Sequence, residues 1–436
     1  MGFKHAGSAA FFLDDDICID GLSHDGRGIG RHKGKTLFVD GALPGETVRV
    51  QVLEDKRRFM NARATQVLAP SPERCAPPCR YFDRCGGCSL QYWTHDGQLI
   101  SKEQIVLDQL RRFAGVVPLE IAKPLVSPPY GYRYRCRFAL RWHKGKLQFG
   151  LRQKASNAIC DIDDCPVLAE PLREIPRLLP ALLLTLTARE VISHAECFLA
   201  DNGRAVLLRH LRPLGDDDRQ RLLDFALTHK LFLYLQSAPE HIELLSPDSG
   251  EMYYCLDDLK LYFRPQDFTQ VNRLVNQAMI EQALDWLALK PTDKVLDLFC
   301  GLGNFSLPVA RRCHHVTGVE GSQSSVDQAR KNATVNGLDN VSFHCANLDG
   351  DIAGQSWVRE CYDIALLDPP RAGAGGMIAR LAGLLPPRLL YISCNPATLA
   401  RDTKVLAAQG YKLHRLGVMD MFPQTAHVES MALFTR

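Results

Sequence analysis

The sequence lacks any long uninterrupted hydrophobic run. Its richest apolar stretch, Leu178–Leu186, is short and contains Pro180, whereas a membrane-spanning helix needs about 20 consecutive apolar residues. Near the N-terminus three acidic residues, Asp14–Asp16, follow so early that no room is left for the apolar segment of a signal peptide. We therefore predict a cytoplasmic protein that does not enter a membrane.

Acidic residues are absent from one stretch, between Ile121 and Cys160. The whole chain of 436 residues is 46% hydrophobic and 23% charged with a net charge of +3, which excludes a wholly disordered protein. Inside this nearly neutral chain, a block without acids indicates a polyanionic partner. The block contains Lys123, Arg133, Arg135, Arg137, Arg141, Lys144, Lys146, Arg152 and Lys154.

The cysteines do not form a pattern typical of disulfides. There are 15, an odd number, spread along the chain, so metal binding or catalysis has to be considered first. Cys79, Cys85 and Cys88 have C-x5-C-x2-C spacing in a loop rich in Pro and Gly, and such cysteines can converge on one metal. A fourth ligand would be Cys75 or a distant residue such as Cys165, which precedes a proline. The spacing leaves an iron–sulfur cluster, structural zinc and unligated thiols open.

The pattern of predicted strands and helices divides the chain into three parts. Residues 1–70 contain short β-branched segments separated by glycines, which predicts a small β-barrel of the OB type. Residues 71–264 form a central α+β region, with a helix at about 96–118 that we expect to pack on the last domain. Strands and helices alternate over residues 265–436, as in a doubly wound parallel sheet with a Rossmann-like fold.

A glycine-rich turn lies between a predicted strand and helix at residues 297–310. Gly301 and Gly303 permit a tight turn and a close ligand, but position 306 is Ser, so the dinucleotide pattern G-x-G-x-x-G is incomplete. Glu320 closes the next strand, where an acid can hold both hydroxyls of a ribose. The combination suits S-adenosylmethionine better than NAD, and the alternative is an ordinary β–α turn.

Three residues near strand ends suggest catalysis. Asp368 precedes two prolines, Cys394 follows an apolar strand, and Glu429 precedes the last strand. C5 of uracil is too weak a nucleophile to take a methyl group from a sulfonium. A thiolate added at C6 makes C5 reactive, and a base must then remove the C5 proton. Cys394 and Glu429 supply such a pair, whereas an isolated cysteine is more often a buried apolar residue and an isolated glutamate is usually solvated.

With these motifs in view, the chain resembles the bacterial 23S rRNA (uracil-5-)-methyltransferases that carry a TRAM domain and a [4Fe-4S] cluster. The motifs CxxxxxCGGC, DFTQVN, DLFCGLGNFS, DPPRAG, SCNP and HVESM occur in the family's order. The resemblance implies C5-methylation of uracil 1939 of 23S rRNA, with Cys394 as nucleophile and Glu429 as base. It implies the cluster ligands Cys79, Cys85, Cys88 and Cys165. It also implies the S-adenosylmethionine contacts Gln270, Phe299, Asn304, Glu320, Asn347 and Asp368.

The resemblance also explains the basic block. Arg133, Arg135 and Arg137 alternate along one predicted strand, so they face the same way and are candidates for RNA binding; the alternative is that they only solvate the strand. We expect 23S rRNA as the partner, without DNA or membrane, and a monomeric enzyme. The competing functions are the same chemistry on tRNA or another rRNA uridine, a non-catalytic Fe–S RNA-binding protein, and an exocyclic amino methyltransferase, which would not need Cys394.

Overall fold

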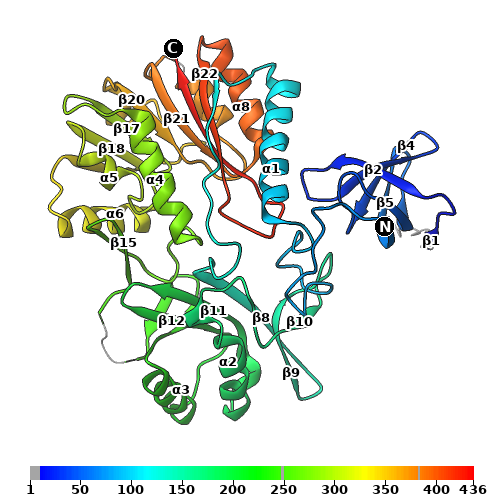
Figure 1. The fold of residues 1–436 in the computed structure, drawn as a ribbon. Helices are drawn as coiled ribbons and strands as arrows, with labels where there is room; N and C mark the ends of the chain where they lie inside the picture. The colour runs from blue at the N-terminus through cyan, green and yellow to red at the C-terminus, as the bar shows by residue number, and fades with distance from the viewer. Residues whose placement is uncertain (1–9, 247–249, 382) are drawn as a thin grey trace, which may run out of the picture. The chain divides into compact units, whose positions relative to one another are not determined.

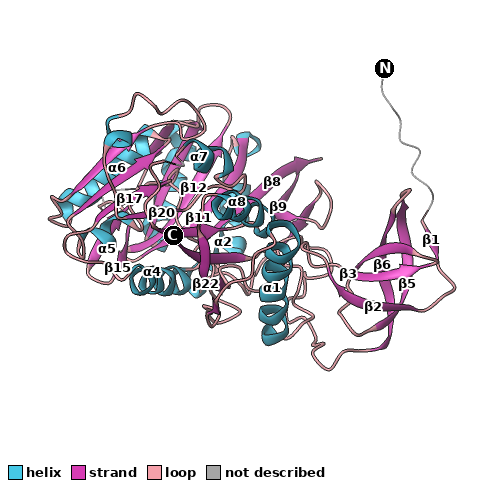
Figure 2. Ribbon diagram, turned by 90° about the horizontal axis from the view of Figure 1, so that it is seen from above, coloured by secondary structure: helices cyan, strands magenta, loops and turns pink. Residues whose placement is uncertain are grey.

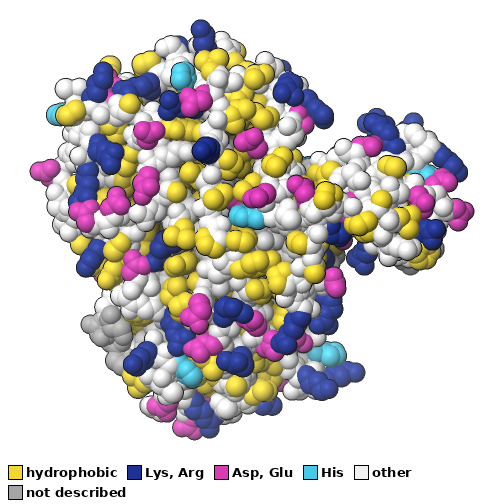
Figure 3. Space-filling model, viewed as in Figure 1, with side chains coloured by type: hydrophobic (Ala, Val, Ile, Leu, Met, Phe, Trp, Pro, Cys, Tyr) yellow, Lys and Arg dark blue, Asp and Glu magenta, His cyan; other side chains and the backbone are white. Residues whose placement is uncertain are grey.

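The computed structural model describes residues 10–246, 250–381 and 383–436, drawn in Figure 1. The N-terminal residues 1–9, where no signal segment is expected, lie outside the described part. None of the described helices combines the length and hydropathy needed to cross a bilayer. Side chains of both charges are interspersed over the face drawn in Figure 3, in keeping with the small net charge.

The chain divides into two compact units, and each is described by itself. The first comprises Met1–Asp83, Cys88–Ile105 and Gln424–His427, and the second comprises Arg84–Gly87, Val106–Pro423 and Val428–Arg436. The predicted three-domain division, with boundaries near residues 70 and 264, stays a prediction.

The first unit contains a closed β-barrel. Its strands are ordered β1-β5-β2-β3-β4-β6, and the additional pairing of β5 with β6 closes the sheet on itself. Inward-facing apolar side chains such as Val39, Val48 and Val50 are fully buried. The predicted OB-like barrel is confirmed. Its strands are β1 (Phe11–Phe12), β2 (Ile17–Leu22), β3 (Gly28–His32), β4 (Lys35–Asp40), β5 (Thr47–Asp55) and β6 (Phe59–Ala69).

Strand β3 contains glycines for a packing reason. A Cβ atom on Gly28 would lie 2.9 Å from Ile19 Cγ2, and one on Gly30 would lie 2.7 Å from Ile17 Cγ2. The sequence indicated that glycines separate the strands of this region, but these two lie within β3 and let β2 and β3 approach closely.

The first unit also holds the segment that leads toward the last strand. Leu90 and Ser89 donate their backbone N–H groups to the carbonyl oxygen of Gln424, over 3.0 and 2.9 Å. The buried amide of Gln98 donates to Gln424 Oε1 and accepts from Gln424 N. Gln98 lies on helix α1 (His95–Gln109), which begins in the first unit and ends in the second. The loop before Glu429 is thereby fixed to residues distant in sequence.

The second unit contains a central sheet of order β10-β9-β8-β11-β12-β13-β14. Neighbouring strands are antiparallel except β12 and β13, which are parallel and joined by the crossover helix α3. The strands are β8 (Arg135–His143), β9 (Lys146–Arg152), β10 (Ile159–Asp161), β11 (Ile192–Ala200), β12 (Gly203–His210), β13 (Leu231–Ala238) and β14 (His241–Leu244), and the helices are η2 (Glu170–Leu172), α2 (Ile175–Thr185), η3 (Arg189–Val191) and α3 (Asp216–His229). A small hairpin follows, formed by β15 (Tyr253–Leu256) and β16 (Leu259–Tyr262).

The same unit contains an eight-stranded sheet flanked by helices (Figure 2), of order β19-β18-β17-β20-β21-β23-β22-β7. Strands β17 to β21 are parallel, and β23 runs antiparallel between β21 and β22. The predicted Rossmann-like domain is confirmed. Its strands are β7 (Glu120–Ile121), β17 (Lys294–Leu298), β18 (His315–Glu320), β19 (Val341–Cys345), β20 (Ile364–Leu367), β21 (Arg388–Ser393), β22 (Lys412–Met419) and β23 (Glu429–Thr435). Its helices are α4 (Arg273–Leu287), α5 (Ser306–Ala310), α6 (Gln323–Val335), η4 (Ser356–Arg359), α7 (Gly375–Arg380) and α8 (Pro396–Ala408).

The helix expected at about 96–118 consists of α1 and a π-helical turn, η1 (Leu110–Ala114). Val106 and Leu110 are fully buried in the hydrophobic core that contains Leu296 and Tyr391 of the large sheet.

We expect Gly30→Ala to destabilise the barrel by about 1–3 kcal/mol, because the new methyl group would overlap Ile17 and the carbonyl oxygen of Cys18. Hydrogen exchange of the β2 and β3 amides should then accelerate. Gly21→Ala is the matched control, since no atom lies within 4 Å of a Cβ at that strand position. Equal exchange rates in the two variants would contradict the packing argument.

Candidate active site

The turn after β17 is shaped by three residues with positive φ. These are Phe299 (φ 65°), Gly301 (φ 57°) and Gly303 (φ 96°). Phe299, a bulky residue, is unusual in the left-handed region, and its backbone N–H is held by the carbonyl oxygen of Val319 at 2.9 Å. The turn is therefore tied to the neighbouring strand β18.

Glu320 ends β18 and faces this turn. Its Oε2 accepts from Gly301 N at 3.2 Å, and its Oε1 accepts from Ser322 N at 3.0 Å. A carboxylate has about four acceptor positions, so Glu320 can orient both loops and still accept further hydrogen bonds from a ligand's hydroxyl groups.

Three other predicted cofactor contacts lie on different loops. Asn304 exchanges two amide hydrogen bonds with Asn276 of α4, and its Oδ1 also accepts from the Tyr254 hydroxyl at 2.9 Å. Gln270 lines a small cavity with Asn276 and Tyr254. Asn347 is exposed beyond β19, and its Oδ1 accepts from the backbone of Asp349 at 3.0 Å. Asn304 therefore links the glycine-rich turn to α4.

Two carboxyl groups lie at the carboxyl ends of β17 and β20, where Asp297 is buried and Asp368 is partly buried. Burial raises the pKa of Asp368 to about 7. Burial also raises the pKa of Asp297 to about 7, against the hydrogen bond from Ser306, while the charges of Asp368 and Glu320 add to the increase. Asp297 Oδ1 has no hydrogen-bond partner within the described residues. These groups form an acidic site that favours a positively charged ligand.

Sequence reasoning did not select Asp297. The available signal was an acid within the otherwise apolar strand segment 295–298, because an acid in a buried strand needs a structural or functional reason.

Strand register brings Cys394 and Glu429 together. In the antiparallel pair β21–β23, Ser393 lies opposite Ser430, so the next positions outward are Cys394 and Glu429. Burial raises the pKa of Cys394 to about 11, and the charges of Glu429 and Asp368 add to the increase, whereas Arg371 lowers it. The thiol is half-buried and lies within electrostatic reach of both carboxyl groups. The predicted nucleophile and base are therefore neighbours at one edge of the sheet.

The loop after Asp368 is fastened to helix α8. Asn395 Nδ2 donates to the carbonyl oxygen of Arg371 at 3.2 Å, and Arg401 Nη2 donates to that of Ala372 at 2.8 Å. The fully buried Asp402 accepts from Ala374 N at 2.6 Å and from the Tyr391 hydroxyl at 2.7 Å. These bonds hold the loop that carries Arg371 beside the Cys394 strand end.

The four cysteines of the predicted cluster divide between the two units. Cys79 and Cys88 pack against the hydrophobic cluster of Phe82 and Leu90 in the first unit. Cys85 and Cys165 are buried in the second. Throughout the described ranges, no group of three or more His, Cys, Asp or Glu is placed to hold a metal ion. The metal centre stays a prediction from spacing.

The three predicted RNA-binding arginines have different surroundings. Arg135 pairs with Glu196 at 2.7 Å and donates to the carbonyl oxygens of Pro265 and Asp267. Arg133 Nε donates to the carbonyl oxygen of Arg135 at 2.9 Å. Arg137 is exposed. Whether any of them binds RNA stays a prediction.

A doubly wound sheet with a glycine-rich turn, an acid ending the second strand and an acidic carboxyl edge is the arrangement of an S-adenosylmethionine-dependent methyltransferase. Comparison with known proteins narrows this class. Residues 94–436 match the family model described as tRNA (Uracil-5-)-methyltransferase, and residues 16–65 match the TRAM domain. The chain belongs to the tRNA (uracil-5-)-methyltransferase family.

Individual relatives cover nearly the whole chain. The 23S rRNA (uracil(1939)-C(5))-methyltransferase RlmD of Photobacterium profundum is 46% identical over 97% of this chain and 93% of its own length. The protein of the same name from Pseudomonas aeruginosa is 47% identical over 96% and 93%. A solved structure of Pyrococcus abyssi tRNA (uracil-54, C5)-methyltransferase with S-adenosyl-L-homocysteine has a TM-score of 0.72. The match covers 97% of this chain and 100% of the solved chain, with 24% sequence identity. This likeness supports the fold.

We expect Asp297→Asn to change how stability depends on pH. A free Asp has a pKa near 3.9, so between about pH 4 and the raised pKa of about 7 the folded state holds a proton that the unfolded state has released. Folding stability therefore falls as pH rises through this window, and the amide removes that loss.

Urea unfolding from pH 4 to 8 should show the variant gaining stability relative to the wild type as pH rises. Asp285→Asn, at an exposed position of α4, is the control and should follow the wild type. Parallel curves for Asp297→Asn and the wild type would contradict a raised pKa.

Proposed function

We propose that this protein transfers a methyl group from S-adenosylmethionine to C5 of a uridine in 23S rRNA, uracil 1939. The observation that carries the proposal is the register that sets Cys394 beside Glu429 at the sheet edge occupied by Asp368. The two relatives described above are named for this reaction and this nucleotide. The same proposal places the enzyme in the cytoplasm with its RNA.

In the proposed reaction, Cys394 acts first. Its Sγ releases its proton to water and adds to C6 of the uracil, which puts electron density on C5. C5 then forms a bond with the methyl carbon as the bond from that carbon to sulfur breaks. Glu429 removes the C5 proton, the ring double bond re-forms, and the bond from Sγ to C6 breaks. The Arg371 charge favours the Cys394 thiolate.

The proposed cofactor contacts are those implied by family resemblance. Glu320 would accept hydrogen bonds from the ribose hydroxyls, and Asp368 lies where the acidic edge favours a sulfonium. Phe299, Asn304, Asn347 and Gln270 would form the rest of the pocket. Since Asn304 already bonds to Asn276 and Tyr254, its proposed contribution is to shape the turn as well as to contact the ligand.

The proposed cluster ligands are Cys79, Cys85, Cys88 and Cys165. Their support is the C-x5-C-x2-C spacing and the Cys-Pro at position 165, since these soft thiolate donors suit iron–sulfur clusters. We propose a structural role for the cluster, because methyl transfer moves no net electrons.

Trapping with 5-fluorouridine tests the nucleophile. Fluorine at C5 cannot leave as a proton, so the wild type should remain covalently attached to a fluorinated 23S rRNA fragment in the presence of S-adenosylmethionine. Cys394→Ala should give no methylation and no adduct. With unmodified RNA, Glu429→Gln should form the adduct but release product at least about 100-fold more slowly, because the base is missing.

Gel bands that resist denaturation report the adduct, and mass spectrometry of the trapped fragment identifies the uridine. Cys345→Ala, at an exposed position, is the control. An adduct with tRNA alone would overturn the rRNA assignment, and an adduct in Cys394→Ala would overturn the nucleophile.

Metal analysis tests the cluster. Anaerobically purified protein should contain roughly four iron atoms per chain, and Cys88→Ser should lose most of them. Cys75→Ser should keep them, because Cys75 donates its thiol to the carbonyl oxygen of Gln91 and lies outside the proposed ligand set. Stoichiometric zinc in place of iron, or iron loss only in Cys75→Ser, would refute the assignment.

A further inference from the structure

One face of the central sheet carries a cluster of polar side chains beside the apolar Leu207. Register places His194 opposite Arg209, Arg209 opposite Gln236, and Glu196 opposite Arg137, so these five side chains point to the same side. The alternate residues are buried apolar side chains on the other side. They include Phe138, Leu208 and Leu235.

These polar side chains line a groove of about 280 Å³. The groove also includes Pro265 and Gln266, from the loop that leads to Gln270. On strand β11, Glu196 lines the groove, and Phe198, two residues further on, lines the cavity that contains Gln270. The groove and the cavity that contains Gln270 therefore lie on the same side of β11.

Among the described residues that line the groove there is one carboxylate, Glu196, and it is already paired. Glu196 bonds to Arg135, whose guanidinium also binds the carbonyl oxygens of Pro265 and Asp267 and lies 4.6 Å from the Phe198 ring centre. Arg135 is therefore occupied by intramolecular bonds that hold the loop after β16.

The other two arginines of the groove, Arg137 and Arg209, differ from Arg135 in their pairing. Within the described residues, neither Arg137 nor Arg209 forms an ion pair, and Arg209 Nε is a buried donor without an acceptor. A buried donor without an acceptor is unfavourable, so an acceptor placed beside the Arg209 guanidinium would be favoured. Burial and the charges of Arg137, Arg209 and Arg152 lower the pKa of His194. Three cations therefore lie near one imidazole.

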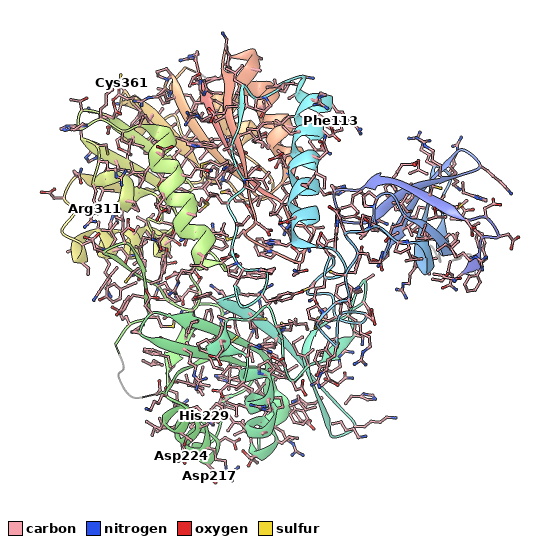
Figure 4. The ribbon with its side chains drawn as sticks, viewed as in Figure 1. Phe113, Asp217, Asp224, His229, Arg311 and Cys361 are labelled. Atoms are coloured by element: carbon pink, nitrogen blue, oxygen red, sulfur yellow. The ribbon has the colours of Figure 1, made fainter. Side chains whose placement is uncertain are left out.

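Two other acidic residues of this region, on helix α3, lie outside the groove. Asp217 and Asp224 are exposed on α3 (Figure 4), and no residue of α3 lines the groove. The groove thus has a local positive charge that the overall net charge does not reveal.

We propose that this groove binds the sugar–phosphate backbone of the RNA, with Arg137 and Arg209 contacting phosphates next to the segment that presents the target uridine. The inference rests on the proposed function for its choice of polyanion. Guanidinium groups bind phosphate oxygens in a bidentate manner, and such contacts position RNA without reading its sequence. Arg135 instead positions the loop before Gln270.

The test is the salt dependence of RNA binding by the full-length protein. For wild type and the double variant Arg137→Ala/Arg209→Ala, affinity for a 23S rRNA fragment is measured from about 50 to 200 mM salt. The slope of log affinity against log salt is negative, and its magnitude should decrease by about 1 for each arginine removed. KM for RNA should rise, while kcat at saturating RNA and the affinity for S-adenosylmethionine stay unchanged.

Two further variants make the result specific. Arg137→Lys/Arg209→Lys should retain most of the slope, because it keeps both charges, and Arg177→Ala, exposed on α2 outside the groove, should behave as the wild type. An unchanged slope in the alanine double variant, or a parallel loss of S-adenosylmethionine affinity, would overturn the proposal.

A second RNA separates this inference from the proposed function. The fragment with the target uridine replaced by cytidine should show the same loss of slope, because phosphates are unchanged. If the wild type methylates the fragment that contains the uridine, but the alanine double variant keeps the wild-type slope, the groove assignment is wrong. If the slope falls but no RNA is methylated, the groove assignment holds and the proposed reaction is wrong.

Discussion

The antiparallel insertion of β23 between β21 and β22 is the constraint on which the candidate active site depends. It sets Ser393 opposite Ser430 and thereby brings together Cys394 and Glu429, which are 35 positions apart in the chain. A slip of one residue would turn every side chain of β23 to the other face. Residues 430–434 of this strand are all buried, so both faces of β23 pack against the core. A slip would put side chains of different size into each other's places, which is costly in a packed core, so core packing fixes this register.

Opposite charges are separated within the second unit. Asp297, Glu320 and Asp368 gather at the carboxyl ends of parallel strands, where the low-dielectric surroundings favour a cationic ligand over an empty site. Arg137 and Arg209, which form no ion pair within the described residues, lie on the central sheet, where a polyanion would be favoured. A methyl donor with a positive sulfur and an RNA backbone are suited to these two different surfaces, and separation keeps the arginines from neutralising the carboxyl groups.

Buried polar networks connect the loops to the sheet. Asp402 joins Tyr391 of β21 to Ala374 of the loop after Asp368, and Arg135 joins the central sheet to the loop before Gln270. Each network places a loop by saturating its backbone groups, since a buried carbonyl or N–H left without a partner is costly. The loops that line the candidate site are thus held in place by residues that lie outside the site.

The sequence by itself determined the alternating strands and helices of the large sheet, the glycine-rich turn, and the position of Cys394 at the end of a strand, because apolar periodicity and the residues at strand ends are local signals. The glycines were expected to separate strands, but Gly28 and Gly30 lie inside strand β3. Glycine is needed there because another strand, β2, approaches closely. The sequence selected Cys394 and Glu429 through chemistry and family resemblance but could not place them side by side. Only the tertiary structure decided that Arg135 is neutralised by Glu196 while Arg137 and Arg209 are not, because pairing depends on strands β11 and β12 far along the chain, and local sequence carries no information about which partner a charge will meet.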